Sequence, residues 1–201
     1  MSEHAGGSQV DHRSRRVRWW LVVALIVGIA QPLQAEEPQR GFIVKDASAR
    51  LSGGVYRLSA AIEYHFSPAV QEALENGVPL TIEIQIEVRR DRWYWLDEEV
   101  ATLNQYYLLQ FHALSRQYLL TGLNSGEQRG FYSLQGALSE MGTLSDIPIL
   151  DSKLLRADTD YQVRLRAQLD IESLPAPLRP VAYLSEEWRL VSEWYSWSLH
   201  S

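Results

Sequence analysis

Leu80-Thr81-Ile82-Glu83-Ile84-Gln85-Ile86-Glu87-Val88-Arg89 is the stretch of sequence that decides the fold. Apolar and polar residues alternate along it, so an extended strand here has one apolar face and one polar face. Strands with one buried and one solvated face are typical of antiparallel sheets, whereas strands of parallel sheets are apolar on both faces. The stretch therefore predicts an antiparallel sheet that covers a core with one side.

Two other stretches show the same alternation. Residues 163–171 place Val, Leu, Ala, Leu and Ile on one face, and residues 56–66 place Tyr, Leu, Ala, Ile, Tyr and Phe on one face. The pair Gly53-Gly54 predicts a hairpin turn between strands at 42–51 and 55–66. Weaker patterns predict strands at 101–112 and 115–123. His65 falls on the face opposite Tyr64, and we expect it to face solvent.

Two short helices are predicted between the strands. Ser67 can cap a helix whose first turn accepts Pro68, and Gly77 can end it, which places the helix near 68–76. Ser133 and Gly142 bracket a second helix at 133–141 in the same way.

The two halves of the chain resemble each other in pattern. Each contains two strands, a short helix, a connection and another strand, over 42–90 and 101–171. Residues 142–160 are expected to be irregular, and the proline-rich residues 174–180 to form an extended connection. The fold class that follows is mainly β: an antiparallel, two-layer, β-sandwich-like domain with two short helices.

The N-terminal residues predict export. Four arginines between positions 13 and 18 precede an apolar run at 19–30, and Ala35 follows as a small residue suited to cleavage. This order is typical of a secretory signal, and the run is shorter than the roughly 20 residues of a spanning helix. We expect a signal peptide at 1–35 and a single β-rich domain at 36–201 in the periplasm. The alternative is a retained anchor that holds the domain at the inner membrane.

The composition after residue 35 makes some classes of partner and cofactor unexpected. It contains 15 basic and 23 acidic residues, so nucleic acid is not an expected partner, because its binding depends on neutralising phosphates. Cysteine is absent from the chain, and the histidines do not have the close spacing of a metal site. We expect no tightly bound metal or organic cofactor, and no motif in the sequence predicts a catalytic site.

Aromatic residues are the unusual feature of the sequence. They gather in two segments, together with one arginine: Arg92, Trp93, Tyr94 and Trp95, and then Trp188, Trp194 and Trp197. One interpretation is packing in the core, with arginine stacked on indole. A second is a patch that binds a partner, because Trp, Tyr and Arg concentrate binding energy. A third is a position at a membrane surface.

The C-terminal part of the sequence carries a family resemblance. Its motifs are Phe131-x-Ser133-Leu134, Ile147-Pro148-Ile149, Leu178-Arg179-Pro180 and Trp188-x-Leu190-x-Ser192-x-Trp194-x-x-Trp197. Their order resembles the DUF4390 family of proteobacterial exported proteins of unknown function, over about residues 40–199. The resemblance implies a short secreted or N-terminally anchored protein whose gene neighbours often include a sensor histidine kinase of the nitrogen-regulation type. It implies no catalytic residue.

Three functions remain open at this point. The first is a non-enzymatic interaction module of the envelope, accessory to a partner such as a sensor kinase. The second is a periplasmic binder of a small apolar ligand held between the sheets. The third is an enzyme whose site is assembled from scattered acids and histidines. An internal pocket, a shallow aromatic surface or a cleft with convergent acids and histidines would distinguish them.

Overall fold

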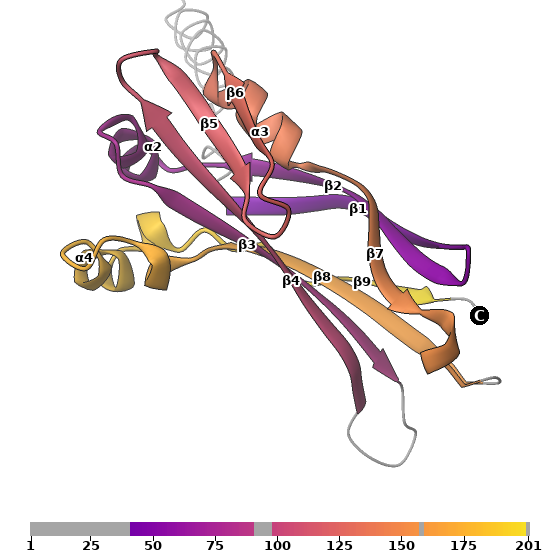
Figure 1. Cartoon of the computed structure of the whole chain (residues 1–201). Helices are drawn as coiled ribbons and strands as arrows, with labels where there is room; N and C mark the ends of the chain where they lie inside the picture. Colours follow the sequence, from indigo (N-terminus) through magenta and orange to yellow (C-terminus); the bar gives the residue numbers. More distant parts are fainter. Residues whose placement is uncertain (1–40, 91–97, 157–158, 200–201) are drawn as a thin grey trace, which may run out of the picture. The chain divides into compact units, whose positions relative to one another are not determined.

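A computed structural model describes residues 41–90, 98–156 and 159–199. It contains two antiparallel sheets around one core, which confirms the predicted fold class (Figure 1). The smaller sheet has the order β1 (Gly41–Ser52), β2 (Val55–His65) and β7 (Thr143–Asp151). The larger sheet has the order β6 (Gln128–Phe131), β5 (Gln117–Gly122), β4 (Glu98–His112), β3 (Leu80–Arg90), β8 (Tyr161–Leu169) and β9 (Tyr195–Leu199).

Strand β3 lies in the middle of the larger sheet, as its alternation predicts. Its apolar residues pair across to those of β8, for example Ile84 with Ala167 and Ile86 with Leu165. These side chains are buried. The polar residues of both strands share the opposite face, so the two faces differ as they do in the sequence.

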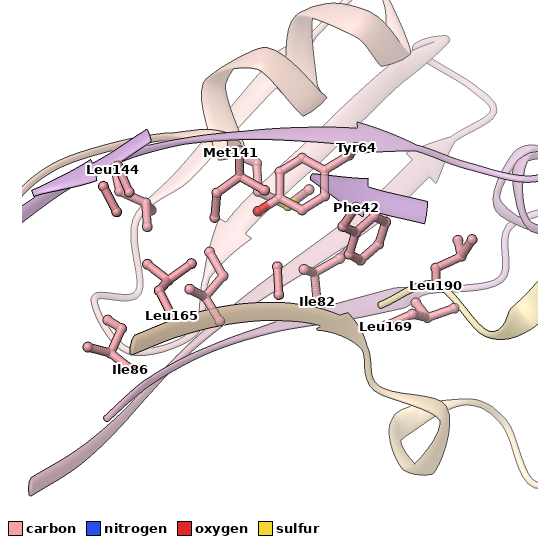
Figure 2. Close-up of a cluster of buried hydrophobic side chains, with 14 of the residues drawn as sticks. Phe42, Tyr64, Ile82, Ile86, Met141, Leu144, Leu165, Leu169 and Leu190 are labelled. Carbon is pink, nitrogen blue, oxygen red and sulfur yellow. The ribbon is translucent and has the colours of Figure 1, made fainter. Parts of the chain in front are cut away.

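The smaller sheet supplies the other half of the core. Residues 56–64 of β2 alternate as expected, and every second side chain is buried against the larger sheet. Figure 2 shows Phe42, Tyr64, Met141 and Leu144 on one side of this core and Ile82, Leu165 and Leu169 on the other. Side chains therefore fill this part of the interior.

Both predicted helices are present. Helix α2 spans Pro68–Glu75, and its cap Ser67 accepts a hydrogen bond from the Val70 amide at 3.2 Å. The Ser67 hydroxyl also donates to the Glu187 carbonyl at 2.7 Å, which holds α2 to the C-terminal part of the chain. Helix α3 spans Leu134–Met141, with Ser133 as its cap.

Strand β7 corrects the expectation that residues 142–160 are irregular. Its pairing with β2 has two register shifts, and Asp146 adopts a positive φ of 58°. These irregularities break the two-residue period that identifies a strand in sequence. Pro148 is accommodated because β7 is an edge strand.

The proline-rich segment requires a second correction. Helix α4 begins within it and spans Arg179–Leu184, with Pro180 in the first turn, where a missing amide costs little. Short 3₁₀ helices connect elements of the described chain: η2 (Ser152–Leu154), η3 (Ile171–Ser173) and η4 (Glu186–Trp188). Ile171 thus lies in η3, beyond the end of β8. No helix within the described residues is long and apolar enough to cross a membrane.

The two halves of the domain exchange strands between the sheets. In the first, the β1–β2 hairpin lies in the smaller sheet, α2 follows, and β3 enters the larger sheet. In the second, β4, β5 and β6 lie in the larger sheet, α3 follows, and β7 enters the smaller one. Each helix therefore carries the chain from one sheet to the other.

Candidate functional site

The aromatic residues predicted as a partner surface occupy different places. Trp188 is buried in the core, and Trp197 is half-buried on the core side of β9. Trp194 precedes β9 and lies on the outer face of the larger sheet. Arg92, Trp93, Tyr94 and Trp95 lie outside the described residues. The described tryptophans thus do not form one patch, and a partner-binding role for these residues stays a prediction.

Trp194 makes the cation–π contacts that the sequence interpretation anticipated. The guanidinium carbon of Arg164 lies 4.1 Å from the centre of its ring system, and that of Arg166 lies 4.6 Å away. Both arginines belong to β8, so these contacts hold the segment before β9 against the larger sheet.

A row of polar pairs crosses this outer face from β8 to β3. Arg164 Nε donates to Glu87 Oε2 at 2.7 Å, and Arg166 donates to the Gln85 side-chain oxygen at 3.0 Å. Further along, Gln168 donates to Glu83 at 2.6 Å. These hydrogen bonds explain how polar residues are tolerated on this face, although the buried Arg166 Nε has no partner within the described residues.

A cleft on the other sheet has the stronger claim to function. It measures about 470 Å³ and lies between α3 and the end of β2. Its lining comes from β1, β2, α3 and the residues that lead into β7: Lys45, Ala61, Ile62, Glu63, Tyr64, His65, Gln135, Leu138, Ser139, Gly142 and Thr143. Most of these side chains are polar, which suits a polar ligand or a protein surface better than an apolar molecule.

Gly142, at the end of α3, contacts β2 closely at one side of the cleft. The Ile62 amide donates to the Gly142 carbonyl at 2.9 Å. A Cβ atom at position 142 would lie 2.1 Å from the Ile62 carbonyl oxygen, so only glycine fits. Beyond this contact the chain belongs to α3, and β2 continues with no strand on that side among the residues that the structure describes.

Three ionisable side chains line one wall of the cleft. Lys45 Nζ lies 3.0 Å from Glu63 Oε2, and His65 Nε2 lies 3.5 Å from the same oxygen. The pairing of β1 with β2 shifts register between Val44 and Asp46, so Lys45 sits at a bulge. The Lys45 ammonium, through its hydrogen bond and its charge, holds the pKa of the Glu63 carboxyl below its ordinary value.

A smaller groove of about 180 Å³ lies beside Trp194. Phe42, Ile43 and Val44 of β1 form one side, and Glu193, Trp194 and Tyr195 form the other. Its size suits one side chain of a partner, and we assign it no role of its own.

The described residues include acids and histidines from which a metal site could be built. No three acids and histidines lie close enough there to hold a metal ion. His112 is exposed, and its Nδ1 lies 3.0 Å from the Ser115 hydroxyl. Neither residue lines the cleft. The cleft offers hydrogen-bonding side chains and the ionisable groups of Lys45, Glu63 and His65.

Some of the residues that line this cleft could be placed close together from the sequence. The alternation of 56–66 places Glu63 and His65 on one outer face, and the hairpin places Lys45 near them. The position of α3 against β2 depends on the irregular strand β7, which the alternation does not reveal. Gln135 and Ser139 could therefore not be assigned to the site from sequence.

Comparison with known proteins identifies the chain by family. No curated protein and no solved structure matches it. The model of a family described as a domain of unknown function, DUF4390, matches residues 39–198, nearly the whole of the chain that the structure describes. The chain therefore belongs to the DUF4390 family.

Proposed function

We propose that this protein is a non-enzymatic interaction module of the bacterial envelope that binds a protein partner in the cleft between β2 and α3. The observation that supports the proposal is the cleft itself, with its polar lining and its open strand edge. Open edges and polar side chains are features by which protein modules take up a segment of another chain.

The partner and the compartment follow from the N-terminal residues and the family resemblance. The signal-like segment at 1–35 supports a domain in the periplasm, either released or held at the inner membrane. The resemblance favours a sensor histidine kinase as partner. The segment with Arg92, Trp93, Tyr94 and Trp95 is a second candidate contact for the same partner.

Site-specific crosslinking tests the proposal. A photo-crosslinking amino acid at Gln135, an exposed residue in the cleft, is expected to capture one envelope protein in intact cells. The same amino acid at Ser196, exposed on β9 and away from the cleft, is the matched control. Capture of nothing from position 135, or of the same proteins from both positions, would refute a partner in the cleft.

A fractionation experiment tests the location. We expect the domain in the periplasmic fraction with an N-terminus near Glu36. An intact N-terminus in the membrane fraction would instead establish the anchored form. Recovery of the protein in the cytoplasm would remove the basis for an envelope partner.

A further inference from the structure

At the end of strand β2, one edge makes no backbone pairing with any strand that the structure describes. Amide and carbonyl groups of a strand point alternately to its two edges, so Ile62 and Tyr64 point the same way. The Ile62 amide donates to Gly142 at 2.9 Å, on the side away from β1. Pairing with β7 stops at Ala61 and Thr143, so no described strand faces the Tyr64 backbone there.

The Tyr64 backbone lines the cleft while its side chain belongs to the core. Tyr64 is 6% exposed, and Figure 2 shows its ring among the buried side chains between the sheets. What this residue presents to the cleft is therefore its peptide groups. Peptide groups that no described strand pairs with are hydrogen-bonding groups that a ligand in the cleft can use.

The charges beside the edge are already compensated. Lys45 pairs with Glu63 at 3.0 Å, and both side chains are about half exposed. His65 Nε2 has no hydrogen-bond partner within the described residues, and its 3.5 Å separation from Glu63 is long for a hydrogen bond. The side chains of Gln135 and Ser139 on α3 add neutral donors and acceptors to the same cleft.

These observations define the class of ligand. An uncharged, extended peptide has a donor and an acceptor at each residue, with the spacing that a strand edge requires. The cleft of about 470 Å³ has room for a few residues between β2 and α3. An ionic ligand would compete with the Lys45–Glu63 pair for these charges, whereas a peptide backbone needs neither of them.

We propose that the cleft binds an extended peptide by strand addition. The peptide backbone pairs with the Tyr64 backbone, on the edge of β2 that pairs with β7 as far as Ala61. This inference rests on the proposed function and specifies how the partner is recognised: by main-chain hydrogen bonds, with little dependence on charge. Only one residue of β2 is available for pairing, so each encounter is weak, and affinity in the cell comes from the rest of the partner.

The test uses the purified domain and a neutral probe, the capped peptide acetyl-Val-Thr-Val-Thr-Val-amide. We expect saturable binding with a Kd on the order of 1 mM, which corresponds to about −4 kcal/mol. The Tyr64 amide is expected to shift in the NMR spectrum and to exchange its hydrogen more slowly in the presence of the peptide.

Two N-methylated versions of the probe make the test specific. In an extended peptide, alternate amides face the same edge, so methylating one alternate set removes the hydrogen bonds to β2 and methylating the other set does not. One version is expected to bind at least about tenfold more weakly, and the other to bind like the parent, because a tenfold change equals about 1.4 kcal/mol. Equal affinities for both versions, or absence of saturable binding, would overturn the proposal.

Protein variants locate the site. Ser139→Trp fills the cleft from α3 and is expected to abolish probe binding, whereas Ser196→Trp on β9 is the matched control and is expected to retain it. Unchanged binding to the Ser139 variant would place the peptide elsewhere and overturn the proposal. A crosslinked partner without probe binding would refute strand addition alone, and probe binding without a crosslinked partner would refute the proposed function alone.

Discussion

The pairing of β3 with β8 and the pairing of β2 with β7 represent opposite ways of building an antiparallel sheet. The first runs from Ile82–Leu169 to Arg90–Tyr161 without a register shift. The second has two shifts, a residue with positive φ and a proline. The regular pair lies inside its sheet and supplies buried residues to the core, whereas the irregular pair lies at an edge and ends beside the cleft. Regularity thus accompanies stability here, and irregularity accompanies the candidate site.

The largest effect is expected from a charge placed in the regular pair. Ile84→Asp puts a carboxylate where the side chain is fully buried, and we expect a loss of more than about 4 kcal/mol in the free energy of unfolding. The melting temperature should fall by about 10 °C or more. Ser198→Asp, on the exposed face of β9, should change it little. An unchanged melting temperature for the Ile84 variant would mean that this face of β3 is not buried.

A second variant removes an ion pair on the polar face of strands β3 and β8. Arg164→Met removes the cation beside Glu87, which is 5% exposed, and should lower the free energy of unfolding by about 3 kcal/mol. Adding Glu87→Gln removes the isolated charge as well and should restore most of this loss. Thermal unfolding of the two variants measures both effects. A double variant that is no more stable than Arg164→Met would show that packing on Trp194, and not the ion pair, is the important contact.

Gly142→Ala tests the irregular region. The added methyl group would meet the Ile62 carbonyl oxygen at 2.1 Å, so α3 or β2 must move, at a cost of about 1–3 kcal/mol. Gly130→Ala is the control, because its nearest contact is 3.4 Å away on the flexible side chain of Gln117. Denaturant unfolding compares the two. Equal stability of both variants would contradict the close contact between Gly142 and β2.

Tyr64→Phe should have a small effect of the opposite sign. The Tyr64 hydroxyl is buried and has no hydrogen-bond partner within the described residues, so its removal should raise the free energy of unfolding by about 1 kcal/mol. Burial raises the pKa of Tyr64, so the unfolded chain loses this proton first as the pH rises. Wild-type stability should therefore fall above about pH 10, and the variant should lack that part of the fall.

Tyr106→Phe is the control for this prediction. Its hydroxyl donates to Glu83 at 3.1 Å, so its removal should destabilise the domain. A Tyr64 variant less stable than wild type would show that its hydroxyl has a partner after all.

The smallest effect concerns the pH dependence at the cleft. Lys45 lowers the pKa of Glu63 in the folded state, so the pair stabilises the fold above the ordinary carboxyl pKa of about 4.3. This contribution disappears as the pH falls through the lower value of the folded state. Melting curves between pH 6 and about pH 3 should therefore decline slightly more steeply for wild type than for Glu63→Gln. Identical slopes would show that the ion pair contributes nothing to stability.

The sequence predicts the regular parts of this molecule because their signal is local. The alternation of β3 and β8, the Gly53-Gly54 turn and the caps Ser67 and Ser133 each depend on residues close together in the chain. Strand β7 was not predicted because its register shifts and the positive φ of Asp146 interrupt the two-residue alternation. Helix α4 was not predicted because it begins within a proline-rich segment. The cleft depends on the contact between Gly142 and Ile62, which are distant in sequence. Local patterns therefore predict the sheets better than the site.

The exchange of strands between the two halves has a consequence for how the domain assembles. The first half lacks β7, which completes its smaller sheet, and the second half lacks β3, which joins β4 to β8. Neither half alone contains a finished layer, so fragments cut near residue 91 should each remain unfolded and should become structured only when mixed. The domain is thus a natural candidate for a split reporter whose two inactive pieces regain their structure on meeting.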